Sequence, residues 1–281
     1  MGKQEQAEFL IEAMPYIKKY FNKVLVVKYG GNAMTDDNLK SSVMRDLVVL
    51  NLLGIKVVLV HGGGPEISET IKMMGKETKF IDGLRYTDKE TAEIVRMVLA
   101  GKVNKSLADL IEKHGGKAVG ICGQDGHIIK CEIQDEKLGF VGKITEIKTD
   151  LIKDLLSLGY VPVISTIGYD DEGNVYNVNA DTAAAAIAGA LSAENLILMT
   201  DIAGLLENKD DPTSLIKKVY VSDIPAFVKQ GIISGGMIPK IECCREAIRR
   251  GVKKAVIIDG RVCHSILIEI LSDEGSGTMF I

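Results

Sequence analysis

Six short motifs that combine glycine with polar or charged residues are the parts of this chain best suited to chemistry. They are residues 28–32 (KYGGN), 61–65 (HGGGP), 83–87 (GLRYT), 177–181 (NVNAD), 200–204 (TDIAG) and 235–240 (GGMIPK). Where a glycine-rich loop leads into a helix, backbone N–H groups converge and attract an anion. Lysine adds positive charge, and arginine can hold a carboxylate with two hydrogen bonds. The motifs therefore indicate a site for phosphate and carboxylate groups.

Two common phosphate-binding patterns do not account for these glycines. No G-x-x-x-x-G-K-[ST] segment occurs in the sequence. The pair Gly62 and Gly64 is followed by Ile67 where a dinucleotide-binding fingerprint requires its third glycine. The sequence is therefore not typical of a P-loop nucleoside triphosphatase or of a nicotinamide-dependent dehydrogenase.

Alternating strands and helices must position the motifs. Apolar runs predict buried strands at 24–27, 55–60, 117–122, 160–166, 196–199 and 255–258, and a β-hairpin within 127–148. Helical spacing predicts helices at 5–21 (with Pro15 inside), 37–53, 65–75, 151–158, 181–191, 236–250 and 265–271. A capping box formed by Thr87 and Glu90 predicts the start of a long helix toward Lys113. We expect an α/β fold: an open, mostly parallel central sheet sandwiched by helices, with a kinked N-terminal helix.

Composition narrows the class of protein. The 281 residues carry 34 Lys and Arg against 38 Asp and Glu, a net charge of −4, with 5% aromatic residues and no Trp. This balance disfavours nucleic acid and anionic membranes as partners. We expect no membrane span, no signal peptide and no metal site, because apolar runs are short and the four His and five Cys lack ligand spacing. The prediction is a cytoplasmic protein whose cysteines are buried and reduced.

The ordered motifs resemble the amino acid kinase family over nearly the whole chain. Within it, residues 83–87 and 177–181 are similar to members that phosphorylate the γ-carboxylate of N-acetyl-L-glutamate with ATP in arginine biosynthesis. Another family member that forms an acyl phosphate on a different acidic amino acid is one alternative. A non-catalytic arginine-sensing module is another, although the retained Lys28, Asp181 and Lys240 argue against it.

This reaction would suit the residues. A carboxylate acceptor has an ordinary pKa near ~4.3, so it is ionised at neutral pH and needs no general base. The transferred phosphoryl group carries negative charge that two cations would stabilise, and we expect Lys28 and Lys240 to supply them. The resemblance implies that Asp181 holds the two lysines in position. Surface lysines and a helix-capping aspartate are the plainer interpretations.

The resemblance also assigns ligand contacts. We expect the amino-acid substrate to bind Arg85, through its α-carboxylate, together with Asn177, Gly62 and Gly63. The expected nucleotide-binding residues are Gly30, Gly31, Thr200, Asp201, Gly204, Leu206, Ile232, Ser234 and Gly236. Mg²⁺ is expected as a cofactor bound through the ATP phosphates, without a protein cage.

Both ends of the chain resemble the arginine-inhibited, hexameric branch of the family. The resemblance implies an arginine site between the N-terminal helix and the C-terminal segment, formed by Tyr16, Glu269, Gly275 and Gly277. It also implies three units: an oligomerisation helix (1–22), a lobe for the amino acid (23–190) and a lobe for ATP and arginine (191–281). A PII-type signalling protein is a further candidate partner.

Overall fold

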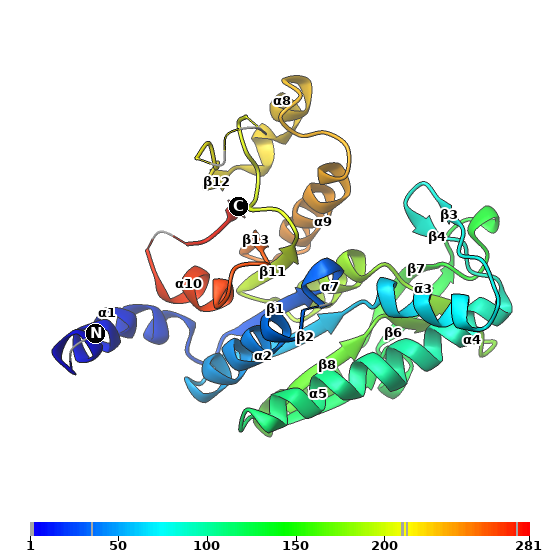
Figure 1. The fold of residues 1–281 in the computed structure, drawn as a ribbon, viewed down its shortest axis with the longest axis horizontal. Helices are drawn as coiled ribbons and strands as arrows, with labels where there is room; N and C mark the ends of the chain where they lie inside the picture. Colours follow the sequence, from blue (N-terminus) through cyan, green and yellow to red (C-terminus); the bar gives the residue numbers. More distant parts are fainter. Residues whose placement is uncertain (1–2, 35, 209–210, 212, 274) are drawn as a thin grey trace.

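An eight-stranded sheet forms the centre of the computed structural model, which describes residues 3–34, 36–208, 211, 213–273 and 275–281 (Figure 1). Its strands in spatial order are β12 (Lys218–Val219), β14 (Thr278–Phe280), β13 (Lys254–Asp259), β11 (Asn195–Thr200), β1 (Val24–Tyr29), β2 (Lys56–His61), β8 (Val161–Ser165) and β5 (Ala118–Cys122). Every neighbouring pair is parallel except β13 with β14. The predicted open, mostly parallel sheet is confirmed.

Helices cover both faces of this sheet and make two hydrophobic cores. One face carries α2 (Asp37–Leu52), α3 (Gly64–Met73), α5 (Asn104–Lys113) and α10 (Ser265–Leu271). The other carries α6 (Asp150–Ser157), α7 (Ala180–Ala190), α8 (Ile224–Lys229) and α9 (Met237–Arg249). Strand residues alternate between the cores: Leu25 and Val27 enter the first, and Val26 the second. Both faces are buried, so the strands read as continuous apolar runs.

The long helical region after residue 87 departs from the prediction at its start and in its middle. Its first segment is α4 (Lys89–Arg96), and Asp88 rather than Thr87 caps it, with Oδ1 accepting from the Thr91 N–H at 2.7 Å. The Thr87 hydroxyl instead donates to the Arg85 carbonyl, so the capping-box prediction is wrong. A π-helix, η2 (Met97–Val103), then joins α4 to α5.

A second, four-stranded sheet lies at one end of the molecule. Its order is β10 (Val175–Asn177), β9 (Ile167–Tyr169), β6 (Ile129–Ile133) and β7 (Gly142–Ile147). The antiparallel pair β6 and β7 is the predicted hairpin. The strands β9 and β10 and the short hairpin of β3 (Phe80–Ile81) and β4 (Leu84–Arg85) were not predicted, because two- and three-residue strands carry no readable alternation. The 3₁₀ helices span Gly31–Met34, Asp125–His127, Glu136–Leu138 and Val221–Asp223.

The N-terminal helix α1 (Lys3–Tyr20) extends away from the body of the molecule and packs against α10 (Figure 1). It continues through Pro15. Among its described side chains, Ile11 and Met14 are about two-thirds exposed, at 65% and 61%. Apolar side chains this exposed on a projecting helix are available for contact with another chain.

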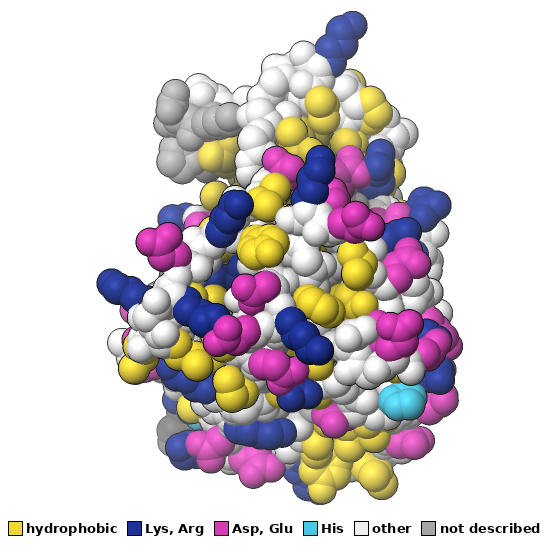
Figure 2. Space-filling model, turned by 90° about the vertical axis from the view of Figure 1, so that its right-hand side faces the viewer, with side chains coloured by type: hydrophobic (Ala, Val, Ile, Leu, Met, Phe, Trp, Pro, Cys, Tyr) yellow, Lys and Arg dark blue, Asp and Glu magenta, His cyan; other side chains and the backbone are white. Residues whose placement is uncertain are grey.

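Charges on the surface are mixed, and most of the thiols are buried. Positive and negative side chains are interspersed over the face shown in Figure 2. None of the described helices is long and apolar enough to cross a membrane. The five cysteines are free thiols, four of them buried as expected, whereas Cys263 is exposed.

The strand order changes direction at β1, which has β2 on one side and β11 on the other. At such a point the connections leave the sheet in opposite directions and open a crevice at the carboxyl ends of the strands. Three of the glycine motifs (28–32, 61–65 and 200–204) begin at the ends of β1, β2 and β11. Two more (177–181 and 235–240) lead into the helices α7 and α9. The sheet is continuous across the lobe boundary that the sequence predicted at residue 190, because β1 from the first lobe pairs with β11 from the second.

Candidate active site

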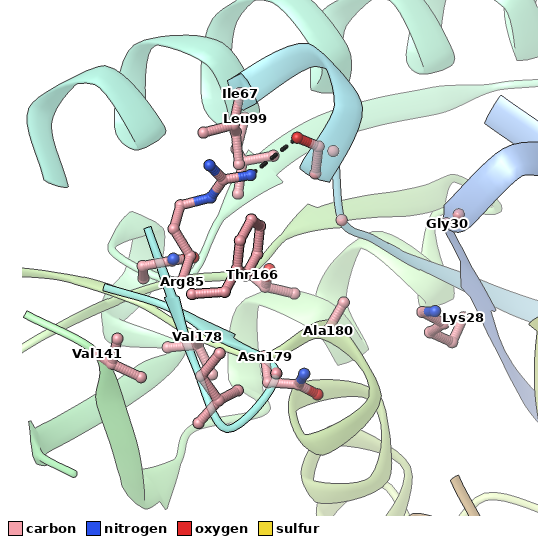
Figure 3. Close-up of a pocket in the computed structure, with 18 residues that line it drawn as sticks. Lys28, Gly30, Ile67, Arg85, Leu99, Val141, Thr166, Val178, Asn179 and Ala180 are labelled. Atoms are coloured by element: carbon pink, nitrogen blue, oxygen red, sulfur yellow. Dashed lines mark hydrogen bonds between the residues drawn. The ribbon is translucent and has the colours of Figure 1, made fainter. Parts of the chain in front are cut away.

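A cavity of about 220 Å³ lies beyond the carboxyl ends of β1 and β2 (Figure 3). Its lining includes the predicted residues Lys28, Gly30, Gly31, Gly62, Gly63, Arg85 and Asn177. Four separate stretches of the sequence therefore meet around one space. Gly30 and Gly31, expected to contact the nucleotide, lie here beside the residues expected to contact the amino acid.

Arg85 lies on one wall of this first cavity, opposite Lys28 (Figure 3). The β3–β4 hairpin carries it, and its guanidinium donates to the Gly64 carbonyl at 2.9 Å and to Ser68 Oγ at 2.8 Å. It also stacks over the Phe80 ring, 4.9 Å from the centroid. Burial lowers the pKa of Arg85, and the group remains a cation at neutral pH. These contacts hold a positive charge facing the cavity.

Asn177, at the end of β10, is held by Thr87. Its Nδ2 donates to Thr87 Oγ1 at 3.2 Å, and Thr87 is fully buried. Thr87 therefore orients both Asn177 and, through the Arg85 carbonyl, the hairpin. Its place in the 83–87 motif was the signal for this role, which a helix-capping interpretation obscured.

Lys28, Asp181 and Lys240 form one ion-pair cluster although they are far apart in the sequence. Lys28 Nζ lies 2.8 Å from Asp181 Oδ1, and Lys240 Nζ lies 3.9 Å from Asp181 Oδ2. Burial opposes ionisation of Asp181, but the two lysine charges outweigh it and lower its pKa. Asn179, rather than Asp181, caps α7, so the helix-cap interpretation of Asp181 does not hold.

The glycine loop after β2 packs tightly against the π-helix. A Cβ on Gly63 would lie 2.7 Å from Leu99 Cδ2. The Gly62 N–H donates to the Tyr29 carbonyl at 3.2 Å, so this amide is part of the sheet in the structure. Gly62 itself still lines the cavity.

A second cavity, of about 600 Å³, lies at the carboxyl ends of β11 and β13. Its lining includes the predicted residues Asp201, Gly204, Leu206, Ile232, Ser234 and Gly236, together with Lys240. Thr200 is buried and is not part of the lining; its hydroxyl bonds within the turn, to the Ile202 carbonyl at 3.1 Å.

The sequence reasoning missed Arg261 in the second cavity. Its guanidinium pairs with both carboxylate oxygens of Asp259, at 2.9 and 2.8 Å, and lines the space beside Asp201. Burial opposes ionisation of Asp259, but the hydrogen bonds and the charge of Arg261 outweigh it, so the pKa of Asp259 is lowered. The sequence signal for Arg261 is the Asp259-Gly260-Arg261 segment at the end of a strand. It was missed because it contains one glycine, without the clustered glycines that are found in three of the six motifs.

A third cavity, of about 140 Å³, lies between α1, α10 and the C-terminal strand. Tyr16, Glu269, Gly275 and Gly277 all line it, as predicted for one site, and Lys254 joins them. Glu269 Oε2 accepts from the Ser276 N–H at 2.7 Å, while burial raises the pKa of the carboxyl group. The cavity thus combines a half-buried acid with the basic side chains of Lys19, Lys217 and Lys254.

Among the described residues, no group of three or more His, Cys, Asp and Glu side chains is arranged to hold a metal ion.

Comparison with known proteins adds to this geometry. The model of the amino acid kinase family matches residues 23–259. Acetylglutamate kinase of Brachyspira hyodysenteriae is 54% identical over all of this chain and 98% of its own length, and acetylglutamate kinase of Caldanaerobacter subterraneus subsp. tengcongensis is 53% identical over 98% and 92%. A solved structure, N-acetylglutamate synthase from Neisseria gonorrhoeae with coenzyme A and N-acetyl-glutamate, has a TM-score of 0.84 at 22% identity over 98% of this chain. This chain spans 63% of that synthase. At this identity the synthase shows likeness of fold alone.

Proposed function

The chain belongs to the amino acid kinase family, and from that premise we propose that it phosphorylates the γ-carboxylate of N-acetyl-L-glutamate with ATP. The product is an acyl phosphate. Full-length relatives at more than half identity carry this activity in their names. The observation that carries the proposal is the cluster of Lys28, Asp181 and Lys240, which joins the first cavity to the second.

The cluster can bring two anions together. Lys28 lines the first cavity and Lys240 the second, so an amino acid in one and a nucleotide in the other would each meet a cation. One γ-carboxylate oxygen attacks the γ-phosphorus of ATP, the new P–O bond forms as the bond to the β-phosphate oxygen breaks, and ADP leaves. The lysines offset the charge gathered on the transferred group, while Asp181 keeps them in position.

Arg85 and Asn177 would bind and orient the amino acid. The guanidinium suits the α-carboxylate because its planar fork can give two parallel hydrogen bonds. In the structure it is bonded to Gly64 and Ser68, so substrate would take over or share those donors. Mg²⁺ bound to the ATP phosphates would supply further charge neutralisation, with the second cavity holding the nucleotide through Asp201, Gly204 and Ser234.

We further infer a division of labour along the chain: oligomerisation by residues 1–22, amino-acid binding by 23–190, and binding of ATP and arginine by 191–281. Arginine would bind in the third cavity, its guanidinium on Glu269 and its inhibition conveyed through α1 and α10. The exposed apolar residues of α1 support a homo-oligomer, for which we propose a hexamer in the cytoplasm. A PII-type protein as a partner is a separate hypothesis, which does not depend on the third cavity.

Trapping of the acyl phosphate with hydroxylamine tests the proposed reaction. The purified protein is incubated with MgATP and one of N-acetylglutamate, glutamate, aspartate or carbamate, with and without arginine. We expect hydroxamate with N-acetylglutamate and a large reduction when arginine is added. Product with another acid would instead support a different acyl-phosphate-forming kinase. No product with any of the four, but saturable arginine binding, would support a sensing module.

A further inference from the structure

His61 is the last residue of β2 and is fully buried immediately before the glycine loop. Its Nδ1 lies 2.8 Å from the Gly62 carbonyl oxygen, and its Nε2 lies 3.0 Å from Asn104 Nδ2. An amide NH₂ group only donates, so Nε2 accepts and the ring proton is on Nδ1. His61 is therefore a neutral imidazole that donates to the Gly62 carbonyl.

Asn104 holds this imidazole from the far side. It is fully buried, and its Nδ2 also lies 2.8 Å from the Val163 carbonyl and 3.1 Å from the Ile121 carbonyl. Those two acceptors show that the NH₂ end of the amide faces them, and its two protons are shared among the two carbonyls and His61 Nε2. Asn104 is the first residue of α5, directly after the π-helix, and Gly120 leaves room for its side chain, because a Cβ on Gly120 would lie 2.2 Å from Asn104 Oδ1. Three elements, β5, β8 and the start of α5, thus fix the ring.

The hydrogen bond to Gly62 sets the direction of the next amide. The described peptide bonds are all trans, and in a trans peptide the C=O and the following N–H point in opposite directions. Since the Gly62 C=O points at His61, the Gly63 N–H points away from it. Gly63 lines the first cavity and His61 does not. The Gly62 N–H is bonded to Tyr29, which leaves the Gly63 amide as the donor that this peptide plane controls.

We propose that His61 is a positioning residue: through the Gly62 carbonyl it aims the Gly63 N–H at the anionic oxygens of the reacting centre in the first cavity. The inference rests on the proposed function for the identity of that anion, a carboxylate or the phosphoryl group passing to it. A preorganised backbone donor of this kind contributes a large share of catalysis in other enzymes, where removing one costs on the order of 10²–10³ in turnover.

Two conservative variants separate the two ring nitrogens. The side-chain amide of His61→Asn reaches the position of Nδ1 and can still donate to Gly62, but it loses the contact with Asn104. The longer His61→Gln reaches Nε2 and keeps the Asn104 contact, but it loses the bond to Gly62. We expect kcat to fall about 10²-fold in His61→Gln, with KM changed no more than about threefold, because Arg85 and Asn177 still bind the amino acid. His61→Asn should recover most of the lost kcat.

Thermal stability and crystal structures of both variants complete the test, with His114→Gln, a substitution directly after the C-terminal end of α5, as control. Both His61 variants should lose similar melting temperature, and only His61→Gln should show the Gly62–Gly63 peptide rotated. An unmoved peptide in His61→Gln, or losses of kcat that follow melting temperature, would overturn the inference. Peptide orientation does not depend on turnover. A wild-type protein inactive on N-acetylglutamate would therefore count against the proposed function alone.

Discussion

Asp181 is a single carboxylate between two cations, so the position of each lysine depends on its ion pair with this carboxylate. Lys28 and Lys240 would repel each other and drift apart without the charge between them. Because the site is largely buried, screening by salt is weak and the geometry is held over a range of conditions. We therefore expect substitutions in this cluster to reduce activity more directly than substitutions of other single residues.

We expect Lys28→Ala and Lys240→Ala each to reduce kcat at least about 10²-fold, because each removes charge stabilisation from the transferred group. Lys130→Ala is the matched control, since Lys130 forms an ion pair with Asp171 on the surface and should keep wild-type turnover. Steady-state kinetics and circular dichroism measure activity and fold. Unchanged turnover in either active-site variant would remove the basis of the assignment.

His61 predicts a dependence of stability on pH. Burial lowers its pKa from 6.5 to about 4, partly offset by the bond to Gly62. As pH falls, the unfolded chain takes up the proton first, so stability is complete above pH 6.5 and is lost between pH 6.5 and 4. Between pH 7.5 and 5 this group should cost about 2 kcal/mol of unfolding free energy.

Urea unfolding of wild type and His61→Asn at pH 7.5 and pH 5, at one protein concentration, measures this cost. The variant has no imidazole at this position, so its stability should fall by about 2 kcal/mol less than that of wild type over the same interval. Equal losses in the two proteins would show that His61 is already protonated or hydrated in the folded state.

At the scale of elements, the π-helix is the support of the glycine loop. Leu99 and Val103 both belong to this element and both face Gly63, at 2.7 and 3.2 Å from the point where a Cβ on that glycine would lie. The φ of Gly63 is 171°, an extended conformation open to any residue, so glycine is required there by packing alone. π-Helical turns are rare and often occur at functional sites.

Gly63→Ala should therefore lower stability by about 1–3 kcal/mol through overpacking against Leu99. The double variant Gly63→Ala, Leu99→Ala should be more stable than the sum of the two single changes predicts. Gly64→Ala is the control, because nothing lies within 4 Å of its Cβ position. Additive losses in a double-mutant cycle, measured by urea unfolding, would mean that the loop moves away from the π-helix instead.

For the whole molecule, α10 connects the third cavity to the helices around the first. Its last turns carry Glu269, while His264 before its start lies 2.5 Å from the buried carboxylate of Asp46 in α2. The helix α1 packs on α10 from outside. A ligand held between α1 and α10 would therefore act on an element that is anchored to α2.

Deleting residues 1–21 should abolish arginine inhibition and reduce the oligomer to a smaller species, while leaving turnover of the same order. Light scattering and inhibition curves measure both effects. Glu269→Gln is the finer change: it removes the negative charge while keeping the shape, so we expect inhibition to weaken at least about tenfold with assembly retained. A hexamer and full inhibition after the deletion would contradict the regulatory proposal.

Local sequence was sufficient to predict which motifs lie at strand ends and that the sheet is mostly parallel. Apolar runs and turn residues act within a few positions, and all six glycine motifs contribute residues to the lining of the first or the second cavity. Local sequence did not predict the short strands or the start of α4, where Asp88 rather than Thr87 accepts the hydrogen bond from the first turn of the helix.

Tertiary structure alone decided which distant side chains meet. Lys28 and Lys240 converge on Asp181 only because the strand order reverses at β1. Arg261, and the pairing of His61 with Asn104, likewise depend on contacts between segments far apart in the chain. The physical reason is that helix and strand preferences are properties of neighbouring residues. The position of a charge or an amide proton depends instead on how whole elements pack.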